Sequence, residues 1–294
     1  MAKRVTQQLV NGGSFFECPR WHDGRWWVSD FHRHSVFAIT PGGEQTTALV
    51  VDAQPAGLGW MPDGSLLVAS MIDRKLLRQR PDGTVEEHAD LTAHCPGYLN
   101  DMTVDAAGRA YVGNYGYDVV GGETRRPTSM VRVDPDGSIT TVADDLHFPN
   151  GAVISPDGRT YVVTETMASR ITAFTVDAEG GLSERREWAR LAAPPATAED
   201  AVESGPDGCC LDADGCIWVA DAFQRTCLRL SEGGAVLDEI TVEGLGLYAC
   251  MLGGEDGRTL LLCAAPNFGT ANRRNARDAS LLVTQVDVPR AGLP

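Results

Sequence analysis

The sequence predicts an all-β protein, a six-bladed β-propeller with four antiparallel strands in each blade. Two observations carry this prediction: a hairpin pattern recurs six times along the 294 residues, and a second, more polar hairpin follows most of the copies. No stretch of helical periodicity competes with the hairpins. We expect residues 1–294 to form a single domain, because all-β folds often exceed about 200 residues as one unit.

The first hairpin of each repeat joins a short apolar strand to a strand rich in Val, Leu, Tyr or Trp, as in WMPDGSLLVAS and ISPDGRTYVVTE. Its turn contains glycine, and Asp-Gly predicts two-residue turns because both central positions accept positive φ. Successive turn glycines lie 40 to 57 residues apart, which is room for four short strands: Gly24, Gly64, Gly108, Gly158, Gly215 and Gly257.

The second hairpin, as in KLLRQRPDGTVEEHAD, completes a four-stranded blade. The last repeat ends in one clear strand, SLLVTQVDV, whereas RVTQQLV precedes the first hairpin without a blade of its own. We therefore expect the N-terminal strand to complete the sixth blade. Closing the ring in this way protects the sheet edges.

Composition limits the partners. The formal charge of −15 and the pI of about 4.7 disfavour nucleic acids and anionic membranes and favour cations. The start of the chain lacks the apolar core of a signal peptide, and no run of 18 apolar residues occurs. We expect a soluble, cytoplasmic protein, and the sequence does not determine its oligomeric state.

The cysteines and histidines give no sign of a soft-metal site. The eight cysteines form no CxxC pair and several lie in apolar runs, so we expect buried thiols rather than disulfides. His32 and His34 could share a strand face, but they have no Cys or carboxylate partner at ligand spacing. We expect both to be surface histidines.

Register along the first strand of each repeat predicts a site on the propeller axis. That strand lies nearest the axis, so equivalent positions in different blades face the same mouth. Ala56 and the apolar run 247–249 take this position in the second and sixth blades. The other four blades carry a carboxylate or carboxamide there, seven or eight residues before the turn glycine: Glu17, Asn100, Asn150 and Asp207. An unpaired polar group there would be costly, so a shared partner is expected.

Glu17, Asn150 and Asp207 offer only oxygen atoms and two negative charges, which matches a hard divalent ion. Ca²⁺ is the expected ion, with Mg²⁺, Mn²⁺ and Zn²⁺ as alternatives, although zinc more often binds His or Cys. Three protein ligands leave coordination positions for water and substrate, as catalysis requires.

The second strand of each repeat ends at the same mouth, six residues after the glycine, where it adds an outer ring: Asp30, Ser70, Asn114, Thr164 and Asp221. These side chains orient the inner ones or contact substrate, which we expect of Asn114 and Asp221; alternatively they cap turns. Three long connectors, 115–129, 193–205 and 268–279, are expected on this face. The last carries Arg273, Arg274 and Arg277, either as a source of positive charge for the site or as a solvated loop.

Four segments resemble those of the regucalcin/gluconolactonase family, also called the senescence marker protein family, of six-bladed propellers. The segments are FECPRW, LNDMTVDAAGRAYVG, FPNGAVISPDGRTYVVTET and PDGCCLDADGCIWVAD. The resemblance implies that Glu17, Asn150 and Asp207 bind the metal and that Asp207 is also the catalytic general base. It implies further that Asn100 contacts substrate or a metal-bound water, and Asp101, which follows it, is expected to contact substrate.

One departure concerns specificity, because Tyr98 stands where sugar-lactone members of that family have Arg. Loss of a guanidinium removes a fixed fork of donors for sugar hydroxyls, so we expect Tyr98 to line a pocket for a less polar lactone or ester. The leading hypothesis is a metal-dependent lactonase. The alternatives are a phosphotriester hydrolase on the same metal, or a non-enzymatic propeller that binds calcium or proteins.

Overall fold

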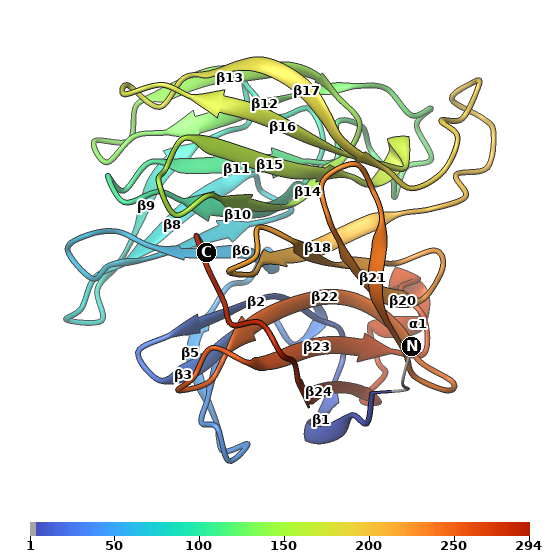
Figure 1. The fold of residues 1–294 in the computed structure, drawn as a ribbon. Helices are drawn as coiled ribbons and strands as arrows, with labels where there is room; N and C mark the ends of the chain where they lie inside the picture. Colours follow the sequence, from blue (N-terminus) through green and yellow to red (C-terminus); the bar gives the residue numbers. More distant parts are fainter. Residues whose placement is uncertain (1–3) are drawn as a thin grey trace.

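The computed structural model describes residues 4–294, which form six four-stranded antiparallel sheets around a ring (Figure 1). The innermost strand of each sheet packs against the innermost strands of both neighbouring sheets. The predicted six-bladed β-propeller with four antiparallel strands per blade is therefore confirmed.

The strands of a blade follow one another in chain order from the axis outward in the first five blades. These blades are β2–β5 (Phe16–His22, Arg25–Asp30, Ser35–Ile39, Gln45–Val50), β6–β9 (Pro55–Trp60, Leu66–Ser70, Lys75–Gln79, Val85–Asp90), β10–β13 (Leu99–Val104, Ala110–Asn114, Thr128–Val133, Ile139–Leu146), β14–β17 (Pro149–Ile154, Thr160–Glu165, Arg170–Val176, Leu182–Arg190) and β18–β21 (Pro206–Leu211, Ile217–Asp221, Thr226–Leu230, Val236–Thr241). The described helices are short: two 3-10 turns, Phe31–Arg33 and Thr166–Ala168, and α1 (Thr270–Arg273).

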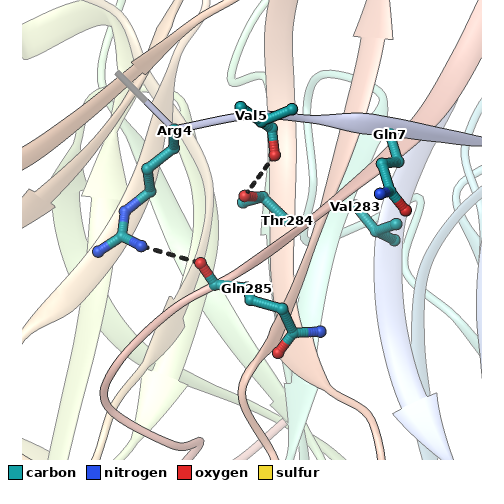
Figure 2. A pocket seen from close by; sticks show the side chains of 6 residues that line it. All are labelled: Arg4, Val5, Gln7, Val283, Thr284 and Gln285. Atoms are coloured by element: carbon teal, nitrogen blue, oxygen red, sulfur yellow. Dashed lines mark hydrogen bonds between the residues drawn. The ribbon is translucent and has the colours of Figure 1, made fainter. Parts of the chain in front are cut away.

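The sixth blade is closed by both ends of the chain. It contains β22 (Gly246–Gly253), β23 (Thr259–Ala265) and β24 (Ala279–Gln285), and β1 (Gln7–Gly13) pairs antiparallel with β24 as its outermost strand. This confirms the expected closure, although β1 begins three residues later than the segment named from the sequence. At this outer edge lies a surface pocket of about 320 Å³, where Thr284 Oγ1 donates to the Val5 carbonyl at 2.9 Å (Figure 2).

The turn geometry corrects one expectation. Only the first hairpin has positive φ at both central positions, Asp23 and Gly24; in the other five, glycine alone has it. In the second blade, Gly64 N–H donates to the Met61 carbonyl and Met61 N–H to Ser65, both at 2.9 Å, which defines a longer loop ending in glycine. The expectation of two-residue turns is wrong for these five, because residues such as Pro62 hold φ near −65°.

The core lies between the blades, where the apolar faces of neighbouring sheets pack together. All eight cysteines are buried and unpaired, which confirms the expectation of thiols. Within residues 4–294, no helix has both the length and the apolar character needed to span a membrane.

Candidate active site

A cavity of about 270 Å³ opens at the mouth of the propeller axis, and its floor carries oxygen atoms from four blades. The four side chains are those chosen by register, each buried and each the second residue of its blade's innermost strand: Glu17, Asn100, Asn150 and Asp207. The repeat therefore brings four oxygen-bearing side chains into one cavity.

A β-bulge in every innermost strand sets the direction of these side chains. The pairing register with the second strand shifts just after the polar residue, for example between Leu99 and Met102 in β10 and between Pro149 and Ala152 in β14. The other four innermost strands have the same irregularity near their starts. A bulge bends the strand and re-aims a side chain, so the start of each strand faces the mouth instead of the neighbouring blade.

Glycines next to the polar residues let the innermost strands approach one another. A Cβ on Gly151 would lie 2.6 Å from the Asp207 carbonyl oxygen, and one on Gly208 would lie 2.5 Å from the Ala249 side chain. No side chain fits at either position. The Asn-Gly and Asp-Gly pairs of the sequence thus combine a polar side chain with the close approach that brings it to the axis.

Hydrogen bonds orient Asn150 and Asp207 relative to each other. Asn150 Nδ2 donates to Asp207 Oδ1 and to Thr166 Oγ1, the latter at 3.2 Å. Thr166 Oγ1 in turn donates to the Pro206 carbonyl at 2.8 Å. Because the amide nitrogen of Asn150 is engaged, its Oδ1 is the atom left to face the cavity.

Within the described residues 4–294, neither of the two floor carboxylates forms an ion pair with a cationic side chain. Burial raises the pKa of Glu17 to about 8; the charge of Asp101 adds to this, against a hydrogen bond from Cys18 N–H. Burial also raises the pKa of Asp207 well above its ordinary value, and the charge of Glu17 adds to the rise. The nearby Arg20 is committed to Asp101, to which its Nη2 donates at 2.5 Å.

This donor set fits a hard divalent cation. Two buried, mutually repelling carboxylates and a carboxamide oxygen are the ligand types that such ions prefer, and a double positive charge would offset both carboxylates. Residues 4–294 contain no group of three or more His, Cys, Asp and Glu side chains arranged for a metal. The predicted set combines only two such residues with Asn150, so the site stays a prediction based on oxygen chemistry.

The walls of the cavity are mostly apolar. Tyr98, which the sequence predicts to line the pocket, is half-buried there, with its ring centroid 6.0 Å from that of Tyr115. Tyr115 stacks on Phe148 at 4.2 Å. The aromatic residues that line the cavity come from all parts of the chain: Phe15, Phe31, Tyr98, Tyr115, Phe148, Phe223, Tyr248 and Phe268.

Three of the residues predicted to bind substrate lie outside this lining. Asp101 pairs with Arg20 beneath the floor. Asn114 receives the Gly116 N–H at 2.9 Å and donates to the Ser129 carbonyl at 2.8 Å. Asp221 receives the Gly205 and Gln224 N–H groups, both at 2.9 Å. Asn114 and Asp221 are therefore engaged in hydrogen bonds to neighbouring loops, as the alternative in which the outer-ring side chains cap turns predicts.

Sequence reasoning missed residues on the rim. His32 is half-buried and lies in the cavity lining beside Gln54, whose Nε2 is 3.0 Å from His32 Nδ1, so the expected surface histidine stands at the rim of the cavity. A 3-10 turn after β3 directs it inward, and sequence periodicity does not show such a turn. Tyr248 lines the cavity as well. Arg274 also lines it, and the sequence names this residue as one of three arginines that could supply positive charge to the site.

The connector 266–278, which we call the lid, holds its three arginines in three different environments. Arg273 is buried, with Nε and Nη2 both donating to the Ser14 carbonyl at 2.9 and 2.7 Å. Arg274 faces the cavity, whereas Arg277 is exposed and bonds only backbone carbonyls of its own loop. Connectors 115–127 and 266–278 contribute to the lining, and connector 191–205 does not.

The comparisons with known proteins agree on one family. A family model described as the SMP-30/Gluconolactonase/LRE-like region matches residues 15–266. A pentonolactonase of Haloferax volcanii is 28% identical over 99% of this chain and 96% of its own length. A 6-deoxy-6-sulfogluconolactonase of Pseudomonas putida is 26% identical over 95% and 93%. A calcium-binding regucalcin structure from Agrobacterium tumefaciens superposes with a TM-score of 0.80 at 22% identity, covering 100% and 99%.

The match to the family model covers most of the chain, so the protein belongs to the SMP-30/gluconolactonase/LRE-like family.

Proposed function

We propose that this member of the family is a divalent-metal-dependent hydrolase of lactones, acting on a substrate less polar than an aldonolactone. The observation that carries the proposal is the cavity itself, which combines an oxygen-lined floor with predominantly aromatic and aliphatic walls. Two curated relatives that match nearly full length are named as lactonases, which supports the reaction class. Their names indicate sugar lactones for those proteins, whereas the walls of this cavity favour a less polar ring or acyl chain.

Glu17, Asn150 and Asp207 would hold the cation. When bound, the ion polarises the ester carbonyl and lowers the pKa of water. Asp207 is the proposed general base: Oδ1 accepts from Asn150, which leaves Oδ2 to take the proton of the attacking water. Asn100 Nδ2 donates to the Pro149 carbonyl at 3.2 Å, and this contact fixes the side chain where it can bind substrate oxygen.

Ca²⁺ is the first ion to test, because the ligands are all oxygen and Ca²⁺ tolerates irregular coordination; Mg²⁺, Mn²⁺ and Zn²⁺ are the alternatives. The Tyr98 ring would pack against the apolar part of the substrate. A phenol cannot supply the paired donors with which a guanidinium recognises a polyhydroxylated ring.

The test is a screen of metal-depleted protein, reconstituted with each ion in turn, against lactones of graded polarity. The expected result is metal-dependent ring opening with higher kcat/KM for alkyl-substituted lactones than for gluconolactone. A phosphotriester and a simple aryl ester belong in the same screen. Turnover of the phosphotriester alone would favour the rival hydrolase, and metal binding without turnover of any compound would favour a non-enzymatic propeller.

A further inference from the structure

The sixth blade breaks the pattern of the cavity floor, because Leu247 stands at the position where four other blades carry an oxygen-bearing side chain. The β-bulge of this blade falls between Leu247 and Ala249, so the residue inside the bulge is Tyr248. Its side chain lines the cavity and is 1% exposed. A bulge re-aims the residue it contains, and here it turns a phenol toward the mouth.

The hydroxyl of Tyr248 has no hydrogen-bond partner among residues 4–294. It lies close to Gly246, the first residue of β22, where an added Cβ would come within 2.5 Å of it, so the phenol extends back toward the mouth. The rings of Phe15 and Phe268 flank it, at centroid distances of 4.9 and 5.9 Å, and neither can accept a conventional hydrogen bond. A buried hydroxyl without a partner destabilises the fold, so its retention in a substrate cavity points to an acceptor on the ligand.

The hydroxyl also stays a donor at physiological pH. Burial raises the pKa of Tyr248 to about 12, and the charges of Asp207 and Glu17 contribute to the rise. Tyr248, Glu17 and Asp207 line the same cavity, and the charge of Arg225 opposes the rise. The cavity lining therefore includes a neutral phenol whose hydroxyl is free to donate.

We propose that the Tyr248 hydroxyl donates a hydrogen bond to an oxygen of the substrate's ester group. This inference rests on the proposed lactonase function and adds to it a residue that the register of the repeat does not select. Tyr248 serves in the sixth blade as the polar contact that Leu247 does not provide. Stabilisation of an oxygen that gains negative charge accelerates the chemical step more than it tightens binding.

The test compares Tyr248→Phe with Tyr111→Phe. Tyr111 is equally buried but lies outside the cavity, and its hydroxyl donates to the Gly180 carbonyl at 3.0 Å. Steady-state kinetics on the best lactone of the screen and thermal unfolding would be measured for metal-saturated proteins. Tyr248→Phe is expected to lower kcat/KM about tenfold, mostly through kcat, while the unfolding midpoint stays level or rises by about 1–3 °C. Tyr111→Phe is expected to lower the midpoint and leave kcat/KM unchanged.

Four outcomes would overturn the inference. If the kcat/KM of Tyr248→Phe stays within about twofold of the wild-type value, the Tyr248 hydroxyl does not donate a hydrogen bond to the substrate. A lowered midpoint with lost activity assigns the hydroxyl a structural role, and a loss confined to KM moves the contact away from the ester. A wild type that hydrolyses no lactone ends the proposed function and this inference together, whereas an active wild type with an unaffected Tyr248→Phe ends the inference alone.

Discussion

Two regions of this propeller bury carboxylates in opposite electrostatic surroundings. In the fourth blade, Glu165 is fully buried and pairs with Arg170 at 2.7 Å and with Arg185 at 3.2 Å. At the axis, Glu17 and Asp207 share the cavity floor, and the nearby Arg20 pairs with Asp101 instead. Burial raises the pKa values of Glu17 and Asp207, whereas the arginines hold the pKa of Glu165 below its ordinary value despite burial.

The difference separates a carboxylate that stabilises the fold from carboxylates kept for a ligand. Glu165 also receives the His147 N–H at 2.8 Å and the Thr172 hydroxyl, so the protein itself satisfies its oxygens. Among residues 4–294, each member of the axial pair accepts one hydrogen bond but forms no ion pair, so the pair costs stability without a cation. Functional sites are where such uncompensated charge is expected, since charge left unpaired in the fold can be paired by a ligand.

The largest effect is expected from Asp207→Asn, which removes a ligand charge and the proposed base. Hydrolysis should fall by about 100- to 10,000-fold, the range of general base catalysis, and divalent-ion binding should weaken. The metal-free variant should be at least as stable as the metal-free wild type, because the substitution relieves repulsion with Glu17. Kinetics and calorimetric titration with Ca²⁺ measure these quantities.

Asp30→Asn is the matched control for that variant. Asp30 is also a buried carboxylate, but it accepts the Ser14 and Phe15 N–H groups at 2.9 and 3.2 Å and lies outside the cavity lining. The control should lose stability and keep its affinity for Ca²⁺. Equal loss of metal binding in both variants would mean that the two kinds of carboxylate do not differ as argued.

Glu165→Gln should be destabilising without affecting catalysis. It removes the carboxylate that pairs with Arg170 and leaves Arg185 with only the longer pairing to Asp145 at 4.0 Å, which is expected to lower the free energy of unfolding by about 2–3 kcal/mol. Denaturant unfolding measures the change. The exposed carboxylate of Glu87, paired with Lys75 at 2.6 Å, supplies the comparison, since Glu87→Gln should cost under about 0.5 kcal/mol. A cost for Glu165→Gln as small as that would show that the network contributes little.

The same residue predicts a pH dependence. The pKa of Glu165 lies lower in the folded state than its ordinary value of 4.5, because the arginines outweigh burial. Such a group contributes stability above its unfolded pKa, and the contribution is lost as pH falls through the folded pKa. The gap in unfolding free energy between wild type and Glu165→Gln should therefore be fully present above pH ~5 and shrink below pH ~4.5. Denaturant unfolding at several pH values tests this, and a gap independent of pH would contradict it.

Arg273 is a buried cation satisfied by the fold, and its removal should loosen the lid. Arg273→Met keeps much of the side chain's bulk but loses both bonds to the Ser14 carbonyl and the pairing with Asp278. We expect KM to rise about tenfold with a smaller change in kcat, since the connector that carries Arg274 would be less ordered. Arg277→Ala in the same loop should change neither value. A KM unaffected by Arg273→Met would mean that the lid does not need this tether.

The parts of this architecture that follow from local rules could be predicted from the sequence. The turn glycines set the repeat, and counting from them identifies Glu17 and Asp207 because strand register fixes direction at the axis. Tyr248 escaped the count because it lies one residue beyond the register position, in a bulge that only the pairing with β23 defines. Asp221 is polar in the expected place, but neighbouring backbone N–H groups take its oxygens, and the sequence does not encode that competition.

The smallest expected effect concerns Tyr98, an aromatic residue of the cavity wall. Its ring faces Tyr115 across the cavity wall, so Tyr98→Arg would place a guanidinium among aromatic side chains, on which it can stack. The new donors can bind hydroxyls of a sugar lactone in pairs, while the lost ring gives up contact with an alkyl chain. We expect the ratio of kcat/KM for gluconolactone to that for an alkyl lactone of equal ring size to rise about three- to tenfold, a change of the size that one wall contact provides. Tyr98→Phe is the control for loss of the hydroxyl alone and should leave the ratio nearly unchanged. If the wild type prefers gluconolactone and Tyr98→Arg leaves the ratio where it was, Tyr98 does not contact substrate, and the polarity of the cavity wall would have to be explained by the loops that carry Phe148 and Phe268.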